Sequence, residues 1–250
     1  MSAISAVLYR EAKIRATNAT FIFWDLFYPL CYMLVFGVGI NAALGAPLSA
    51  PGVDYNAFFL AGVLAMASFG IASNTAWSFF MDRDNGIFYE MLTYPMSRSQ
   101  YLFGKVLFNM FVTLLQAVIT VGVARLLLHV PMRSDRWPLF LLAVAAGTVG
   151  WFFFYAIFAL RMRRNDSFNA VTSIFYFVFL FVSSMFYPLE PLPRWFRLAA
   201  LANPVTWQVD VLRYASIGLV SPQRVAAESA AFLLFTVISF ALAIRALRQQ

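Results

Sequence analysis

Charge is scarce in this sequence. Only 12% of the 250 residues are charged, whereas 62% are hydrophobic and 28 are Phe. Ordinary soluble domains carry about 25% charged residues. A soluble core of this size has no room for so much apolar surface. The composition excludes a soluble globular protein and indicates an integral membrane protein.

Cysteine and histidine are almost absent: the chain has Cys31 and His129 and no others. A structural zinc site needs four ligands and a disulfide framework needs several cysteines. We therefore predict no disulfide and no metal or cofactor in this chain. The net charge is +7. Cations that flank apolar stretches are usually orientation signals, so we expect no nucleic-acid partner.

Catalytic motifs are also missing. The nearest approach to a phosphate-binding loop is Gly104–Lys105, but a Walker A motif would need Gly at Ser99 and Ser or Thr at Val106. The sequence has no HExxH motif, and Asp25 is the one carboxylate inside the predicted spans. Intramembrane hydrolysis would need a Ser/His or paired carboxylate arrangement. The chain is not expected to be an enzyme.

Long apolar stretches, in contrast, are abundant. About 20 apolar residues, each rising 1.5 Å, cross a hydrocarbon layer of roughly 30 Å. Five stretches meet this length, and a sixth is shorter but lies between Glu228 and Arg245, whose side chains can extend to the interfaces. We predict an all-α membrane protein with six transmembrane helices, at residues 21–40, 58–80, 101–130, 139–160, 168–187 and 229–244.

Six spans place both termini on one side. With the N-terminus inside, 11 of the 18 Lys and Arg residues are cytoplasmic and 7 are outside. Cytoplasmic segments usually carry the excess of Lys and Arg. We predict a multi-pass protein of the cell inner (cytoplasmic) membrane with both termini in the cytoplasm.

Two segments outside the spans have unusual patterns. Residues 1–20 place apolar and charged residues at near-helical spacing, which favours an interfacial helix on the cytoplasmic membrane surface. A frayed basic tail is the alternative. Residues 188–228 are apolar, and their longest uncharged run is too short to span. We predict a re-entrant helical hairpin in the outer leaflet, broken at Asn203–Pro204; the alternative is an ordinary amphipathic loop.

The third and fifth spans each carry a distinctive face. In the third span, polar residues recur every three or four positions, and such a face either lines a path or bonds to neighbouring helices. In the fifth span, Phe side chains share a face, which by default points to lipid but could line a path. The residues considered for a path are Asn109, Thr113, Gln116, Phe175 and Phe179.

A short amphipathic segment lies between the second and third spans. We predict a helix at Ile87–Tyr94, ended by Pro95, with an exposed face for lipid or for a groove in a partner. Ser97 and Gln100 form a capping-box pattern that starts the next helix. The candidate coupling residues are Ile87, Phe88, Glu90, Met91, Leu92 and Tyr94.

Three stretches in this order resemble the membrane subunits of ABC-2-type ATP-binding-cassette exporters, which include nodulation-factor and drug export permeases. The first, FYPLCYMLVFGVGI (residues 27–40), resembles that family's first span. The second, YEMLTYPMSRSQYLFGK (residues 89–105), resembles its coupling segment. The third, MFYPLEPLPRWFRLAALANPVTWQVDVLR (residues 185–213), resembles the exit of its fifth span and its outer hairpin.

The resemblance implies a permease subunit of an ATP-driven exporter. It implies a homodimer, membrane lipids as surroundings and a separate cytoplasmic ATPase that binds ATP and magnesium and receives the 87–94 helix. The substrate would be amphiphilic: a drug-like molecule, a lipid or a lipo-oligosaccharide. It also implies an extracellular gate formed by Glu190, Trp195, Pro204, Trp207 and Asp210.

An autonomous secondary transporter or channel is the alternative function. That class would be expected to place ionisable residues near the middle of the membrane. Lys105, Arg125 and Asp25 all fall near the ends of predicted spans. The sequence pattern therefore favours the exporter subunit.

Overall fold

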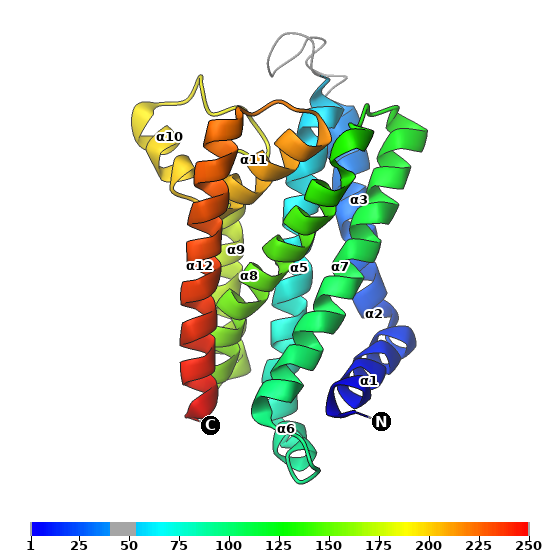
Figure 1. The fold of residues 1–250 in the computed structure, drawn as a ribbon, viewed down its shortest axis with the longest axis vertical. Coiled ribbons are helices and arrows are strands. Elements are labelled where there is room, and N and C mark those ends of the chain that lie inside the picture. The colour runs from blue at the N-terminus through cyan, green and yellow to red at the C-terminus, as the bar shows by residue number, and fades with distance from the viewer. Residues whose placement is uncertain (1, 41–53, 250) are drawn as a thin grey trace.

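The computed structural model describes residues 2–40 and 54–249, and these form helices and connecting segments without a β-strand. The prediction of an all-α protein is confirmed for this part of the chain. The helices run between two ends of a bundle, and both termini lie with α6 (Ile87–Met91) at one end (Figure 1). Helices α10 (Arg194–Leu201) and α11 (Pro204–Ser216) lie at the other end.

Helix α1 (Ala3–Thr17) packs against α7 (Arg98–Leu128). Its buried residues are Val7, Glu11 and Arg15, which follow one another at intervals of four along one face. The segment predicted as an interfacial helix is helical, and its charged residues Glu11 and Arg15 are buried in the bundle. The physical reason is that both find ionic partners inside the bundle.

Five segments are long and apolar enough to cross a membrane: Ala19–Ile40, Tyr55–Asp84, Arg98–Leu128, Ser134–Arg161 and Pro222–Arg248. The first is built from α2 (Ala19–Ile22), α3 (Tyr28–Tyr32) and two π-helical turns, Phe23–Phe27 and Met33–Gly37. The predicted fifth span corresponds to α9 (Asn165–Phe181), whose 17 residues are about 25 Å long. Six spans therefore remain a prediction.

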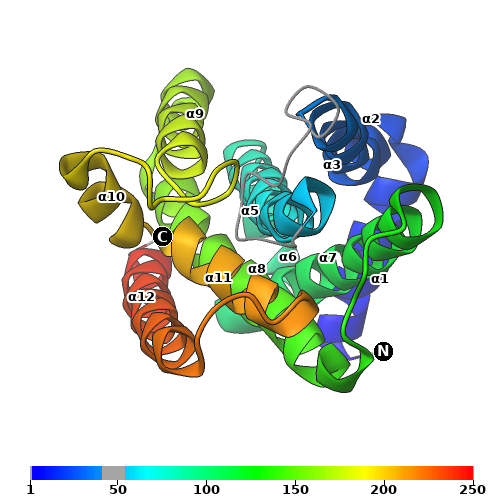
Figure 2. The ribbon, with the colours of Figure 1, turned by 90° about the horizontal axis from the view of Figure 1, so that it is seen from above.

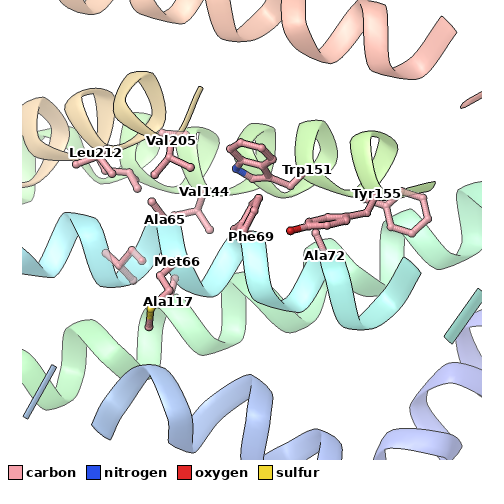
Figure 3. Packing of buried hydrophobic residues seen from close by; sticks show 14 of the residues in the cluster. Ala65, Met66, Phe69, Ala72, Ala117, Val144, Trp151, Tyr155, Val205 and Leu212 are labelled. Atoms are coloured by element: carbon pink, nitrogen blue, oxygen red, sulfur yellow. The ribbon is translucent and has the colours of Figure 1, made fainter. Parts of the chain in front are cut away.

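Helix α5 (Tyr55–Asp84) is the central helix, and every residue from Tyr55 to Phe69 is buried. It packs against α7, α8 (Trp137–Arg161) and α11. Figure 3 shows this core, where Phe69 of α5 lies against Trp151 of α8 with ring centroids 4.6 Å apart. A helix that is apolar on all sides is stable when other helices surround it.

The start of α7 follows the predicted capping box. The side chain of Ser97 accepts a hydrogen bond from the backbone N–H of Gln100, and the Gln100 side chain accepts one from the backbone N–H of Ser97. Gly104 then allows close approach of α1, because a Cβ there would lie 2.7 Å from Val7 Cβ. The helix that follows the coupling segment is thus fixed at its first turns.

Helix α9 ends at Phe181, six residues before the predicted end of the fifth span. Asn203 explains the early end, because its side-chain amide donates hydrogen bonds to the carbonyls of Phe179 and Val182. Ser184 then donates its backbone N–H to Thr206 Oγ1 at 3.1 Å. Two carbonyls at the end of α9 thus find a partner in Asn203, the residue that caps α11, so the helix need not continue.

The break predicted at Asn203–Pro204 is present, since α10 ends at Leu201 and α11 begins at Pro204. Figure 2 shows α11 lying across the end of the bundle, over α8, with α10 at the periphery. The last helix, α12 (Pro222–Arg248), is longer than the predicted span. It can begin at Pro222 because backbone N–H groups in the first turn have no partner within the helix, so the missing N–H of proline costs nothing there. How deeply the hairpin enters a membrane stays a prediction.

Candidate functional site

The α6 segment (residues 85–97) connects the end of α5 to the start of α7. Gly86 opens it with φ +78°, a left-handed conformation that favours glycine. The helix ends at Met91, three residues before the predicted end at Tyr94, because Thr93 donates its hydroxyl to the carbonyl of Glu90 and closes a turn. The predicted eight-residue helix is therefore one helical turn followed by turns before Pro95.

The two sides of α6 have different surroundings. Phe88 is fully buried, with ring centroids 5.5 Å from Phe79 and 5.4 Å from Tyr101. It anchors α6 to both flanking helices. Tyr94 is 61% exposed, and Glu90 is also exposed. The candidate coupling residues Ile87, Met91 and Leu92 are half-buried, so the predicted apolar face is only partly open.

A buried ionic cluster lies next to α6, between α1, α5 and α7. We call Arg10, Glu11, Asp82 and Lys105 the α6-end cluster. The Lys105 ammonium is completely buried, 2.7 Å from Glu11 Oε1 and 2.8 Å from Asp82 Oδ2. Arg10 lies 2.5 Å from Asp82 Oδ1, and Tyr101 donates its hydroxyl to Asp82 Oδ2 at 2.5 Å. The cluster joins α1, α5 and α7.

Arg10 shows the electrostatic balance of this cluster. Burial by itself lowers the pKa of Arg10, but its hydrogen bond to Asp82 and the Asp82 charge outweigh burial and raise the pKa above its usual value. The guanidinium is therefore held in its charged form. The sequence analysis missed the cluster because Glu11 and Asp82 lie outside the predicted spans. The available signal was Lys105, a lysine on the polar face of the third span.

A second polar connection lies one turn further along α1. Arg15 forms an ion pair with Asp25 and donates to Thr75 Oγ1 at 2.9 Å. The Asp25 carboxylate also accepts a hydrogen bond from Asn74 Nδ2 at 3.0 Å. Asp25, the one carboxylate inside the predicted spans, is thus neutralised by α1. The connection fixes α1 to the first span and to α5.

The polar face of α7 points into the bundle. Asn109, Thr113 and Gln116 are buried, and Thr75 donates its hydroxyl to Asn109 Oδ1 at 3.0 Å. Gln116 lies with Arg15 and Asp25 along a cavity of about 250 Å³. The bond between Thr75 of α5 and Asn109 of α7 matches the second use considered for this face, hydrogen bonding between helices.

The Phe face of α9 also points inward, so the default expectation that it faces lipid is wrong. Phe175 and Phe179 stack on each other at 5.5 Å, and both pack against Phe154 of α8. The exposed side of α9 carries Ile174 and Phe177 instead. Aromatic rings prefer offset or edge contacts with one another, and α8 offers several partners for them.

The opposite end of the bundle has its own buried ionic cluster. We call Asp210, Arg213, Arg224 and Glu228 the α11-end cluster. Asp210 binds Arg213, with an N to O distance of 3.3 Å, and also Arg224. Arg224 further binds Glu228 Oε1 at 2.8 Å. This cluster joins α11 to α12.

Arg213 holds α11 to the rest of the bundle. Its guanidinium donates to the carbonyls of Ser184 at 2.5 Å and Phe58 at 3.3 Å, and it lies 3.5 Å from the centre of the Phe58 ring. Burial lowers the pKa of Arg213 to about 10, although Asp210 raises it in part. Arg213 therefore remains charged at neutral pH. Arg213 is one of four arginines in residues 188–228, and nothing in the local sequence distinguishes it from the others.

The residues predicted as an outer gate separate into two groups. Glu190 and Asp210 both line a cavity of about 860 Å³ beside the α11-end cluster. Pro204 is buried at the start of α11, and Trp207 donates its indole N–H to the Leu201 carbonyl at 2.7 Å. Trp195 lies on α10 and is 71% exposed. The structure thus brings two of the five together at a cavity.

Long apolar helices whose charged residues pair with one another inside the bundle define a multi-pass membrane protein. A family model described as ABC-2 type transporter matches residues 2–217, and the chain belongs to that family. The recognition drawn from the three sequence stretches is confirmed. Membership also establishes that the chain is a component of a membrane transporter. It defines neither the substrate nor the energy source.

Relatives with similar sequences carry transport names. The protein named as transport permease ycf38 of Porphyra purpurea is 27% identical over 187 residues, covering 74% of this chain and 64% of that protein. Its counterpart in Pyropia yezoensis is 27% identical over 217 residues, covering 83% and 74%. ABC transporter G family member 20 of Dictyostelium discoideum is 26% identical over 164 residues, covering 65% and 22%. The chain thus spans just under two thirds of the Porphyra relative.

Proposed function

We propose that this chain is the membrane subunit of an ATP-driven exporter and that a separate cytoplasmic ATPase, which binds ATP and magnesium, energises it. The observation that carries the proposal is the α6 segment, which exposes Glu90 in the helix and Tyr94 in the turn after it, while Phe88 anchors the helix to α5 and α7. A short segment that exposes some side chains and is fixed to two long helices by a buried one suits insertion into a groove of a partner. Membership of the ABC-2 type transporter family supports the same reading.

The contacts behind α6 supply a route for mechanical coupling. Phe88 touches Tyr101, Tyr101 bonds to Asp82, and Asp82 meets Lys105, which also holds Glu11 of α1. A push on α6 would therefore act on α1, α5 and α7 together. In this proposal the α6 end and both termini are cytoplasmic, and the membrane is the cell inner membrane.

The exported substrate would be an amphiphilic drug-like molecule, a lipid or a lipo-oligosaccharide. A groove of about 300 Å³ supports a path beside the first span, α5 and α9, where a second permease subunit would complete it. Aromatic and polar side chains share its lining, among them Trp24, Tyr28, Asn74, Thr172 and Tyr176. Such a mixture suits a molecule with apolar and polar parts. The cavity at Glu190 and Asp210 would serve as the extracellular exit.

The test is co-purification with a co-expressed ATPase of the ATP-binding-cassette type from the same organism. We expect Glu90→Arg combined with Tyr94→Asp to abolish ATPase recovery while leaving membrane insertion unchanged, since both side chains are exposed. The matched control is Arg164→Glu, in an exposed ion pair with Asp166 that lies outside α6. Full recovery of the ATPase with the α6 variant would refute the coupling role.

A second measurement tests the energy source. Proteoliposomes that contain the chain with its ATPase should export substrate when ATP is supplied. Transport by the chain alone, driven by an ion gradient, would instead establish a secondary transporter or channel. The buried ionisable groups argue against that alternative, because Lys105 and Asp25 are each neutralised by partners within the bundle.

A further inference from the structure

A polar cavity lies beside α6, and no residue of the α6-end cluster lines it. Its volume is about 540 Å³, within the range of roughly 300–1,000 Å³ that is typical of small-ligand sites. Its walls come from the end of α5, α6, the end of α8 and the last turns of α12, at the end of the bundle where both termini lie (Figure 1). The lining residues are Arg83, Asp84, Tyr89, Leu160, Arg161, Arg163, Ala246 and Gln249.

The lining is strongly cationic. It contains three arginines and one carboxylate, a net charge of 3 − 1 = +2. Arg83 already has partners within the protein, since its guanidinium donates hydrogen bonds to the carbonyls of Leu160 and Met162. Arg161 and Arg163 are exposed, and neither has an ion-pair partner among residues 2–40 and 54–249. Two guanidinium groups are therefore available to an anion.

The position of the cavity favours a lipid as the source of that anion. Leu242 and Ile238 lie one and two turns from Ala246 along α12, and both are at least 39% exposed. An exposed apolar strip on a spanning helix is a surface for acyl chains. The strip runs along α12 from the membrane to the cationic cavity. One lipid molecule would therefore place its acyl chains on the strip and its headgroup in the cavity. Basic pockets between spanning helices commonly bind acidic lipid headgroups.

We propose that this cavity binds the phosphate-bearing headgroup of an anionic membrane lipid, with Arg161 and Arg163 as the phosphate ligands. Guanidinium groups match phosphate oxygens in geometry and charge. Tyr89 of α6 also lines the cavity, so its hydroxyl can donate to the same headgroup. A bound lipid would tie α6 to the end of α8, which makes the coupling segment sensitive to lipid composition. The inference goes beyond the proposed function and does not require the ATPase.

The experiment compares retained lipid in the purified full chain by native mass spectrometry. The chain is exchanged into mixed micelles containing equal phosphatidylglycerol and phosphatidylcholine. We expect wild type to retain phosphatidylglycerol about tenfold over phosphatidylcholine, and Arg161→Gln combined with Arg163→Gln to lose most of that preference. Arg164→Gln is the matched control on the same loop; Arg164 is 80% exposed, pairs with Asp166 and lies outside the cavity lining. It should retain the preference.

Three outcomes would overturn the proposal. Equal loss in the double variant and in Arg164→Gln would show attraction by surface charge in general. Displacement of the lipid by inorganic phosphate at equal concentration would identify a site for free phosphate. An unchanged lipid preference in the double variant, together with lost ATPase binding, would assign both arginines to the protein partner. A thermal unfolding scan in phosphatidylcholine alone confirms that each variant is folded.

Discussion

The two ends of the molecule each contain a buried ionic cluster, but their surroundings differ. In the α6-end cluster, Lys105 has no exposed surface and lies between Glu11 and Asp82. In the α11-end cluster, Arg224 is 38% exposed and lies with Asp210 along a cavity of about 860 Å³. Charges sealed from water cannot change partners cheaply, whereas charges beside a cavity can exchange them for water. We infer a rigid α6 end and an α11 end that can rearrange.

The largest effect is expected from Lys105→Met. This change leaves Glu11 and Asp82 buried with one cation fewer, and removal of one partner from a buried pair costs about 3–5 kcal/mol. Unfolding in detergent, followed by circular dichroism, measures the loss. Adding Glu11→Gln and Asp82→Asn should recover much of the stability, because the unpaired charges are gone. An unchanged unfolding midpoint in Lys105→Met would contradict the inference that the α6-end cluster is closed off from water.

Phe88→Ala tests the anchor of α6 on the same rigid end. Replacing a buried Phe by Ala leaves a cavity and costs about 3–5 kcal/mol when it is fully enclosed. We expect the lower part of this range, since α6 lies at the edge of the bundle. Proteolysis after Tyr94 should accelerate in the variant. A cleavage rate equal to that of wild type would show that Phe79 and Tyr101 do not hold α6 in place.

Asp210→Asn tests the α11 end. Arg213 and Arg224 lose their shared carboxylate, but Arg213 keeps the carbonyls of Ser184 and Phe58, and Arg224 keeps Glu228. Hydrogen bonds to charged groups contribute about 1.5–3 kcal/mol, so we expect a loss of about 2 kcal/mol, less than for Lys105→Met. The same unfolding assay measures it. A loss greater than that of Lys105→Met would reverse the comparison between the two ends.

Gly104→Ala tests the contact between α1 and α7. The added Cβ would lie 2.7 Å from Val7 Cβ, and overpacking of this kind costs about 1–3 kcal/mol. A gain in helix propensity of about 1 kcal/mol offsets part of that cost, so the net loss should be near 1 kcal/mol. Val7→Ala keeps the Val7 Cβ but removes Cγ1, which would also lie 2.7 Å from the added Cβ, so Gly104→Ala should cost less stability in a Val7→Ala background than in wild type. An equal cost in the two backgrounds would show that space does not limit this contact.

The smallest effect is expected from Asp166→Ala. Its ion pair with Arg164 is exposed at both side chains, 80% and 89%, and separated by 3.8 Å. Exposed pairs typically contribute between 0.2 and about 1 kcal/mol, so the unfolding midpoint should barely move. A loss equal to that of Asp210→Asn would mean that exposure does not separate strong pairs from weak ones in this protein.

Much of the architecture could be predicted because apolar length and capping are local signals. The capping box at Ser97 and the break at Asn203–Pro204 follow from neighbouring residues alone. The end of α9 and the burial of Glu11 could not be predicted in this way. Each depends on a side chain distant in sequence, Asn203 for the helix end and Lys105 for the carboxylate. Local patterns carry no information about which distant partner satisfies a polar group.

The most direct test of the contrast between a rigid and a rearranging end is a pair of spin-label distances. The measurement uses the proposed complex with an ATPase, in a Cys31→Ser background, with labelled chain diluted among unlabelled chain so that only distances within one chain are measured. One label pair, Lys13→Cys with Arg98→Cys, reports on the α6 end; the other, Glu190→Cys with Gln223→Cys, reports on the α11 end. All four native side chains are exposed. We predict that ATP trapping with vanadate leaves the first distance unchanged and shifts the second. A change in the first distance with a constant second distance would contradict the account.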